Sequence, residues 1–284
     1  MRNGLNLILA CVWIVLALLI IGLMVQGINK GTSGFRNIFF LNNNSGRENV
    51  IQEYEFDSNG ITAVDVDVVS ESVSFDTTDE SQFKVVITGN SLVENLPKCY
   101  VEGNRLVVAT EKRTLFNLKV LPSQVRISVP KNATLSVLTG KTVSGSVSVD
   151  NQNVERIIIG STSGSLRVSN SSTTERVEGS TVSGSIRLEG TFPGFNLSST
   201  SGSVRVENGT DIVKDSDVSS VSGSVRLYLR QKSGLQIQYS SVSGSCRNEL
   251  TNTTGGKRGT DMYKDNSTSL HINTTSGSIR VERL

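Results

Sequence analysis

Six arginines recur at a regular interval in the second half of the chain, and their spacing predicts a binding surface. They are Arg167, Arg187, Arg205, Arg226, Arg247 and Arg280. Guanidinium groups bind phosphate and carboxylate through paired hydrogen bonds. The column is therefore a candidate ladder for an anionic ligand such as a wall glycan or a lipid headgroup.

Acidic residues accompany this column two positions further along several repeats. They are Asp150, Glu189, Glu207, Glu249 and Glu282. Adjacent ladders of opposite charge would relieve repulsion between neighbouring arginines without any ligand. The placement of the acids favours this structural interpretation over a binding site.

Catalytic patterns are weak in this sequence. Ser81 and Lys84 fit a Ser-x-x-Lys spacing, but the companion motifs of that enzyme class are missing. His271 stands alone and lies on the outward side of an expected strand. We therefore expect no enzyme activity, no catalytic residue and no cofactor.

Three aspartates are candidates for a metal site, and two cysteines are candidates for a disulfide. Asp211, Asp215 and Asp217 cluster in one expected loop, where they could hold calcium only weakly, so no metal site is predicted. Cys246 occupies an inward aliphatic position typical of a small core residue. Whether Cys246 pairs with Cys99 stays open at this point.

The composition indicates strands and turns. The chain has 284 residues with 36% hydrophobic and 5% aromatic residues, and Gly 26 exceeds Pro 4. The net charge of +2 argues against a nucleic-acid partner, and the apolar share is too high for a disordered chain.

One tripeptide, Ser-Gly-Ser, recurs seven times at intervals of about 20 residues, apart from a longer last interval. Its glycines are Gly145, Gly164, Gly184, Gly202, Gly223, Gly244 and Gly277. Aliphatic residues dominate two and four positions after each glycine, and Val or Thr stands two positions before it. This alternation predicts an inward column of Val/Thr, glycine and two aliphatic residues, with a corner at polar pairs such as Ser198 and Ser199.

A unit of this size cannot bury its own apolar stripe, but stacked units can. The repeats therefore predict an all-β fold, a single-stranded parallel β-solenoid (β-helix) of about seven rungs. Residues 141–284 would form the repeats and residues 51–140 a β-rich N-terminal cap with the first rungs. The insertion at 250–267 is expected to be a loop or a projecting hairpin, and Asn248 would break the aliphatic column where it begins.

Residues 5–25 read LNLILACVWIVLALLIIGLMV and would rise about 31 Å as a helix, enough to cross a membrane. We expect residues 1–27 to be an N-terminal transmembrane anchor, with a cleaved signal peptide as the alternative, and residues 28–50 to be a tether. Flanking charges nearly balance, but a short N-terminal tail before a long domain favours export of that domain. The expected location is the cell membrane, single-pass, with the repeats extracytoplasmic.

The segments VRISVPKNATLSVLTGKTVSGSVSVD and TSLHINTTSGSIRVERL, with the Ser-Gly-Ser units between them, resemble a known family. It is the bacterial putative-adhesin family of unknown function, whose Ser-Gly-(Asp/Ser) rungs follow a strand ending in Val-Pro, here Val129-Pro130. The resemblance covers roughly residues 55–284 and implies a β-solenoid. Members often carry Asp after the glycine, whereas every copy here has Ser, so no role of those aspartates is transferred.

Together these patterns predict a non-enzymatic, membrane-anchored scaffold or binding module of the bacterial cell envelope. Its partners would be the membrane, through the N-terminal helix, and an envelope glycan or a protein ligand. Two alternatives stay open: a polysaccharide-acting β-helix enzyme and a cytoplasm-facing membrane regulator. The sequence does not determine the oligomeric state.

Overall fold

The computed structural model describes residues 50–89, 96–110, 123–265 and 268–284, which lie in one compact unit. Within them the chain is all β, with no helix. The predicted anchor at 1–27 and the tether up to residue 49 lie outside the described residues. No helix long and apolar enough to span a membrane occurs among the residues that are described.

The first eleven strands cover the N-terminal part and the first repeats. They are β1 (Val50–Asp57), β2 (Ala63–Asp67), β3 (Ser72–Thr78), β4 (Gln82–Thr88), β5 (Lys98–Glu102), β6 (Arg105–Ala109), β7 (Gln124–Pro130), β8 (Val137–Thr142), β9 (Val147–Asp150), β10 (Asn153–Ser161) and β11 (Leu166–Thr181).

The other eleven strands cover the later repeats and the insertion. They are β12 (Ile186–Thr191), β13 (Phe195–Ser199), β14 (Val204–Asn208), β15 (Ser216–Ser220), β16 (Val225–Leu229), β17 (Leu235–Ser241), β18 (Cys246–Asn248), β19 (Thr253–Gly256), β20 (Arg258–Tyr263), β21 (Ser269–Thr274) and β22 (Ile279–Arg283).

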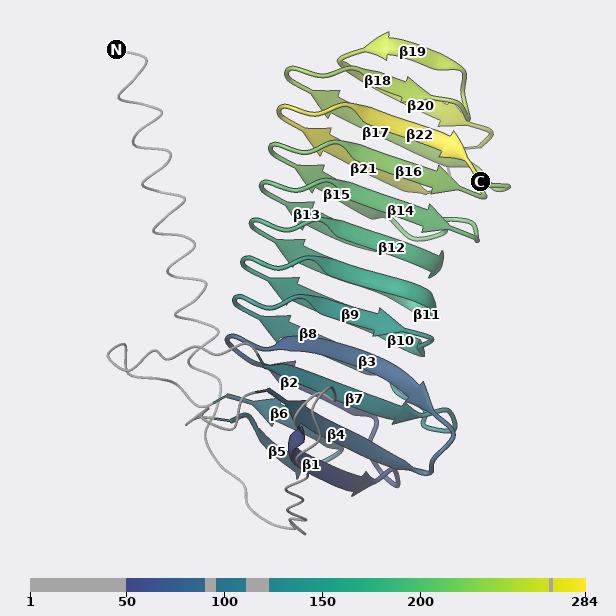
Figure 1. Cartoon of the computed structure of the whole chain (residues 1–284). Coiled ribbons are helices and arrows are strands. Elements are labelled where there is room, and N and C mark those ends of the chain that lie inside the picture. Colours follow the sequence, from purple (N-terminus) through teal and green to yellow (C-terminus); the bar gives the residue numbers. More distant parts are fainter. Residues whose placement is uncertain (1–49, 90–95, 111–122, 266–267) are drawn as a thin grey trace, which may run out of the picture. The chain divides into compact units, whose positions relative to one another are not determined.

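The strands stack in two rows that meet along the Ser-Gly-Ser corners (Figure 1). The first face runs β5-β6-β2-β8-β10-β11-β13-β15-β21-β17-β20, using the second half of β11. The second face runs β1-β4-β7-β3-β9-β11-β12-β14-β16-β22-β18-β19, using the first half of β11. One strand from each face, joined at a corner, makes one rung.

Pairing is parallel in the middle of both faces and antiparallel at their ends. Equivalent repeat residues pair with one another, as in Leu166 with Ile186 and Ile186 with Val204. The parallel stacking predicted from the repeat is therefore confirmed. The antiparallel strands β1, β4 and β5 at one end and β19 and β20 at the other cover the rungs that would otherwise leave open edges.

The order of the rungs in space differs from their order in the chain. The last rung, β21–β22, lies between β15–β16 and β17–β18. At the other end, β2–β3 lies between β6–β7 and β8–β9 in the same way. The rungs are therefore not stacked in chain order. At the N-terminal end the chain forms β4 to β7 on the outer side of β2–β3 before β8–β9 is added on the inner side. At the C-terminal end it forms β17 to β20 first, and β21–β22 then fills the space between them and β15–β16.

The insertion explains the rearrangement at the C-terminal end. Its strand β19 pairs antiparallel with β18 and its strand β20 pairs antiparallel with β17, so it covers the outermost rung on both faces. The expectation of a loop or a projecting hairpin is therefore wrong. Asn248 is fully buried, and its side-chain amide donates to Asp261 Oδ2 at 2.8 Å, which ties the rung to the insertion.

The corner lies nearer the glycine than the sequence suggested. The chain bends from the residue two positions before the glycine onward, as in Val182 to Ser185. Val182, Val221 and Val242 are consequently 41%, 47% and 61% exposed, so the prediction that this position faces inward is wrong. The residue that faces inward is the Ser or Thr one position earlier. The inward and outward alternation of side chains is interrupted at the bend and begins again at the glycine.

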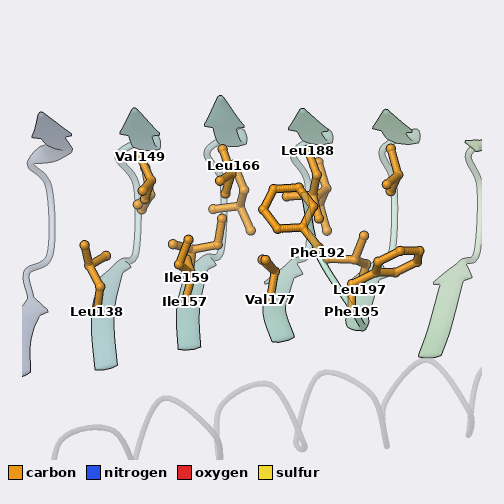
Figure 2. Close-up of a cluster of buried hydrophobic side chains, with 14 of the residues drawn as sticks. Leu138, Val149, Ile157, Ile159, Leu166, Val177, Leu188, Phe192, Phe195 and Leu197 are labelled. Atoms are coloured by element: carbon orange, nitrogen blue, oxygen red, sulfur yellow. The ribbon is translucent and has the colours of Figure 1, made fainter. Parts of the chain in front are cut away.

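Stacked aliphatic side chains fill the space between the two faces (Figure 2). Two of the large buried rings pack closely against a glycine. A Cβ atom at Gly140 would lie 2.8 Å from the ring of Phe75, and one at Gly190 would lie 2.7 Å from the ring of Phe192.

Candidate functional site

The Ser-Gly-Ser corners bring the backbones of successive rungs into direct contact. A Cβ atom at Gly202 would lie 1.9 Å from the carbonyl oxygen of Gly184, and one at Gly164 would lie 1.8 Å from that of Gly145. Glu71 takes the place of the glycine in the β2–β3 rung, below Gly145. Its carboxylate accepts hydrogen bonds from the backbone amides of Val69 and Ser70. The repeat glycines are therefore structural.

A buried hydroxyl three residues before each glycine connects the corners. These residues are Thr142, Ser161, Thr181, Ser199, Ser220, Ser241 and Thr274. Each donates to the carbonyl oxygen of the corner residue in the neighbouring rung, at 2.8 to 3.0 Å. This hydroxyl ladder was not predicted from the sequence, although every repeat carries Ser or Thr at this position.

The six arginines of the candidate ladder lie on the second face in one column. Register places Ser148 beside Arg167, followed by Arg187, Arg205 and Arg226. Arg280 comes next and Arg247 last, because the C-terminal rung is inserted between the earlier two. The structure thus brings the predicted residues together but reverses the last pair.

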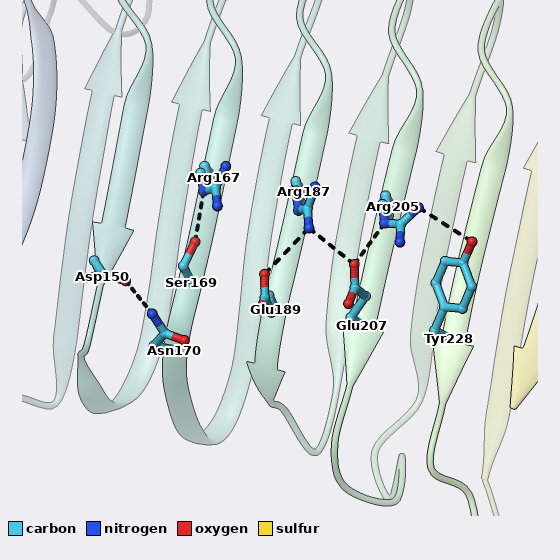
Figure 3. Close-up of polar contacts among 9 residues, drawn as sticks. All are labelled: Asp150, Arg167, Ser169, Asn170, Arg187, Glu189, Arg205, Glu207 and Tyr228. Atoms are coloured by element: carbon cyan, nitrogen blue, oxygen red, sulfur yellow. Dashed lines mark hydrogen bonds and ion pairs between the residues drawn. The ribbon is translucent and has the colours of Figure 1, made fainter. Parts of the chain in front are cut away.

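Acidic side chains pair with the middle of the column (Figure 3). Glu207 Oε1 accepts from Arg205 Nε at 2.8 Å and from Arg187 Nη2 at 3.3 Å. Arg187 also lies 3.6 Å from Glu189. The hydrogen bond to Glu207 is the main cause that raises the pKa of Arg205. In this segment the arginines have a structural partner, as the alternation of acids and bases predicted.

The ends of the column are paired differently. Arg167 Nε donates to Ser169 Oγ at 2.9 Å, because this rung has no acid two positions on. Arg247 forms a 3.2 Å salt bridge with Glu249, and its side chain remains 62% exposed. Arg226 and Arg280 are exposed, and no carboxylate among the described residues lies within 4.0 Å of either one.

The Ser-x-x-Lys pair lacks the geometry of a catalytic site. Lys84 Nζ forms a 2.6 Å salt bridge with Glu53, and this hydrogen bond raises the pKa of Lys84. A general base of this kind needs a lysine with a lowered pKa. Ser81 is exposed, and His271 lies on the first face beside Asp217.

Two of the three aspartates bind the backbone of neighbouring segments, and Asp217 lies in strand β15. Asp211 accepts hydrogen bonds from the backbone amides of Lys232 at 2.7 Å and Ser233 at 3.0 Å, one rung further along. Asp215 accepts from the backbone amide of Ser269 at 2.9 Å. No group of three or more potential ligand side chains that could hold a metal occurs among the described residues.

The two cysteines lie near opposite ends of the stack, Cys99 in β5 and Cys246 in β18, and both are free and buried. The pairing left open by the sequence is therefore not formed. Burial raises the pKa of both thiols, that of Cys246 to about 12, with a smaller contribution from the Asp261 carboxylate. Thiols in this state are poor nucleophiles.

Solved structures with a similar fold cover most of the chain at low identity. A cell adhesion protein from Clostridium sporogenes, described as putative, is 11% identical with a TM-score of 0.37, covering 82% of this chain and 99% of its own. A protein from Parabacteroides distasonis described as a putative lipid binding protein is 16% identical with a TM-score of 0.48, covering 81% of this chain and 96% of its own. A putative adhesin from the same organism is 12% identical with a TM-score of 0.44, covering 81% of this chain and 96% of its own.

No curated protein matches this chain. The model of one family, Toastrack DUF4097, matches residues 110–282, which include all seven Ser-Gly-Ser corners and the insertion. The matched segment is more than half of the chain, and the family is a domain of unknown function. The resemblance to this class of repeat domains is therefore confirmed, and the chain belongs to the Toastrack DUF4097 family.

Proposed function

We propose that this protein is a non-enzymatic binding scaffold of the bacterial cell envelope. Its N-terminal residues 1–27 would anchor it in the membrane, and the stack of rungs would stand outside the cytoplasm. The ligand would be an extended envelope polymer rather than a small substrate.

One observation carries this proposal: the same charged side chain recurs at the same place on six rungs of one face. Parallel strands repeat every 4.8 Å or so, and the column therefore extends over roughly 25 Å. A small substrate would contact only one or two members of such a row. A linear polymer can contact many of them at once.

Residues considered above for catalysis, for calcium binding or for a disulfide support a binding role in a second way. Lys84, Asp211 and Asp215 each have a structural partner, and the buried thiol of Cys246 has a raised pKa. None of these groups is free to exchange protons with a substrate. We therefore expect binding without turnover.

Binding and turnover can be measured in one experiment on the full chain purified in detergent. Isolated envelope glycans would be incubated with the protein, and both the bound fraction and new reducing ends would be measured. We expect saturable binding with no release of reducing ends. Release of reducing ends above the protein-free control would instead show a polysaccharide-cleaving enzyme.

The topology needs a separate test on intact cells. Protease added outside should cleave within residues 50–284 if the rungs are extracytoplasmic, while a cytoplasmic control protein stays intact. Cleavage only after the cells are broken would contradict the proposed orientation.

A further inference from the structure

The arginine column is not uniform along its length. Arg187 and Arg205 share Glu207, and Arg247 pairs with Glu249. Arg226 and Arg280 lie beside each other in register, are exposed, and have no carboxylate of the described residues within 4.0 Å. Arg167 also lacks a carboxylate, but its guanidinium donates to Ser169. Arg226 and Arg280 are therefore the adjacent pair in the column that has neither an acid nor a hydroxyl partner among the described residues.

Tyr228 explains why compensation fails at this point. It occupies the position where the preceding rungs carry Glu189 and Glu207, and it pairs in register with Glu207. Its hydroxyl accepts from Arg205 Nη1 at 3.4 Å, and its ring lies 4.4 Å from the guanidinium carbon of Arg205. Tyr228 is thus engaged by the preceding rung and offers no negative charge to Arg226.

The carboxylates nearest to Arg226 and Arg280 in the column do not neutralise their charges. Glu207 contacts Arg187 and Arg205 in the column (Figure 3). Glu282 follows Arg280 on the same strand, but the two are not within salt-bridge distance. Like charges directly opposite each other on adjacent strands destabilise a sheet. The fold therefore tolerates an unfavourable pair here, whereas the opposed Arg187 and Arg205 are compensated by Glu207.

We propose that Arg226, Arg280 and Arg247 form a binding site for a linear polymer that carries repeated oxyanion groups, either phosphate or carboxylate. The three guanidiniums stand on consecutive strands, so they span about 10 Å along the stack. Each can bind one oxyanion through paired hydrogen bonds. Arg247 also contacts Glu249, but its side chain stays 62% exposed at the end of the column. Arg187 and Arg205 share Glu207 and Arg167 donates to Ser169, so these three contribute little.

The site lies many strands away from the point where the N-terminal segment joins the described unit, and the choice of a polymer as its ligand rests on the proposed function. The N-terminal segment joins the described unit at Val50 in β1, the first strand of the second face. Seven strands separate β1 from β16, which carries Arg226. At strand spacing this is close to 40 Å along the stack. Binding to anionic vesicles tests the membrane as the alternative ligand.

The test uses the full chain in detergent and three probes: inorganic polyphosphate, polyglutamate, and vesicles containing phosphatidylglycerol. We expect binding to at least one of the two polymers, and the double substitution R226Q/R280Q should weaken it at least tenfold. The variant should keep its thermal unfolding midpoint, because the substitution also removes a repulsion.

The matched control is R105Q/R156Q, which removes the same two charges from the first face, where Arg105 pairs with Asp65 and Arg156 with Glu175. It should change polymer binding less than threefold. Equal losses in both variants would show a general charge effect and overturn the site. Binding to the vesicles but to neither polymer would also overturn it, because the ligand would then be a membrane surface. If R226Q/R280Q unfolds, R226K/R280K keeps the charge but loses the paired hydrogen bonds and should still weaken binding.

Failure of this site and failure of the proposed function give different results. Polymer binding that survives R226Q/R280Q would overturn the site and leave the scaffold role. Absence of any polymer or glycan binding would overturn both.

Discussion

The clearest test of how this fold is held together is the substitution Gly202→Ala in the middle of the stack. The new Cβ atom would lie 1.9 Å from the carbonyl oxygen of Gly184, and ordinary van der Waals contact begins near 3.4 Å. The two rungs would have to separate by roughly 1.5 Å, and a backbone carbonyl in a parallel sheet has no flexible end that could move instead.

The separation would also break hydrogen bonds at the corner. Ser199 Oγ donates to Gly184 O and accepts from the amide of Gly202, both at 2.9 Å. Overpacking with the loss of buried hydrogen bonds predicts a destabilisation of about 3 kcal/mol or more. The measurement is denaturant unfolding followed by far-UV circular dichroism, with hydrogen exchange of the amides in the adjoining rungs.

Gly160→Ala is the matched control, because Gly160 also lies in a strand of the stack but a Cβ there would have no neighbour closer than 3.7 Å. This substitution should change the free energy of unfolding by no more than about 1 kcal/mol, and alanine could stabilise the strand. If Gly202→Ala were as mild as the control, direct backbone contact at the corners would not be what requires glycine.

Three further predictions concern the corner hydroxyls, the buried thiol and the insertion. Ser220→Ala removes the hydroxyl that donates to Gly202 O and accepts from the amide of Gly223, both at 2.9 Å, and should cost about 2 kcal/mol in chemical unfolding, whereas Ser220→Thr should be tolerated. The pKa of Cys246 is raised from 9.0 to about 12, so between these pH values the folded state keeps a thiol proton that the unfolded state has lost. This contribution to the free energy of unfolding is fully present below pH 9 and is lost as the pH rises toward 12. Cys246→Ala should therefore reduce the loss of stability at alkaline pH. Asp261→Ala leaves the buried amide of Asn248 without its acceptor, so limited proteolysis should cleave the insertion sooner than in the unmodified chain, and equal cleavage rates would contradict this anchoring role.

The stacking itself was readable from local sequence, because alternation, a fixed repeat and Ser-Gly-Ser specify which residues face inward and which strands are equivalent. The arginine column followed from the same register. The corner was misplaced because valine at the position before Ser-Gly reads as apolar and inward, whereas Val182 and Val221 are exposed at the bend. The Ser or Thr that stands three residues before each of the seven glycines indicates the true position of the corner, since a buried hydroxyl needs a hydrogen-bond partner in the backbone.

The sequence alone determined the all-β repeat, its period, the glycine at each close approach and the family to which the chain belongs. Only the tertiary structure decided the order of the rungs, because β21–β22 and β17–β18 carry equivalent motifs and either could stack on β15–β16. The antiparallel layer of β19 and β20 settles this by covering β17–β18 as the outermost rung. That order places Arg280 between Arg226 and Arg247, and so determines which arginines stand together without acids.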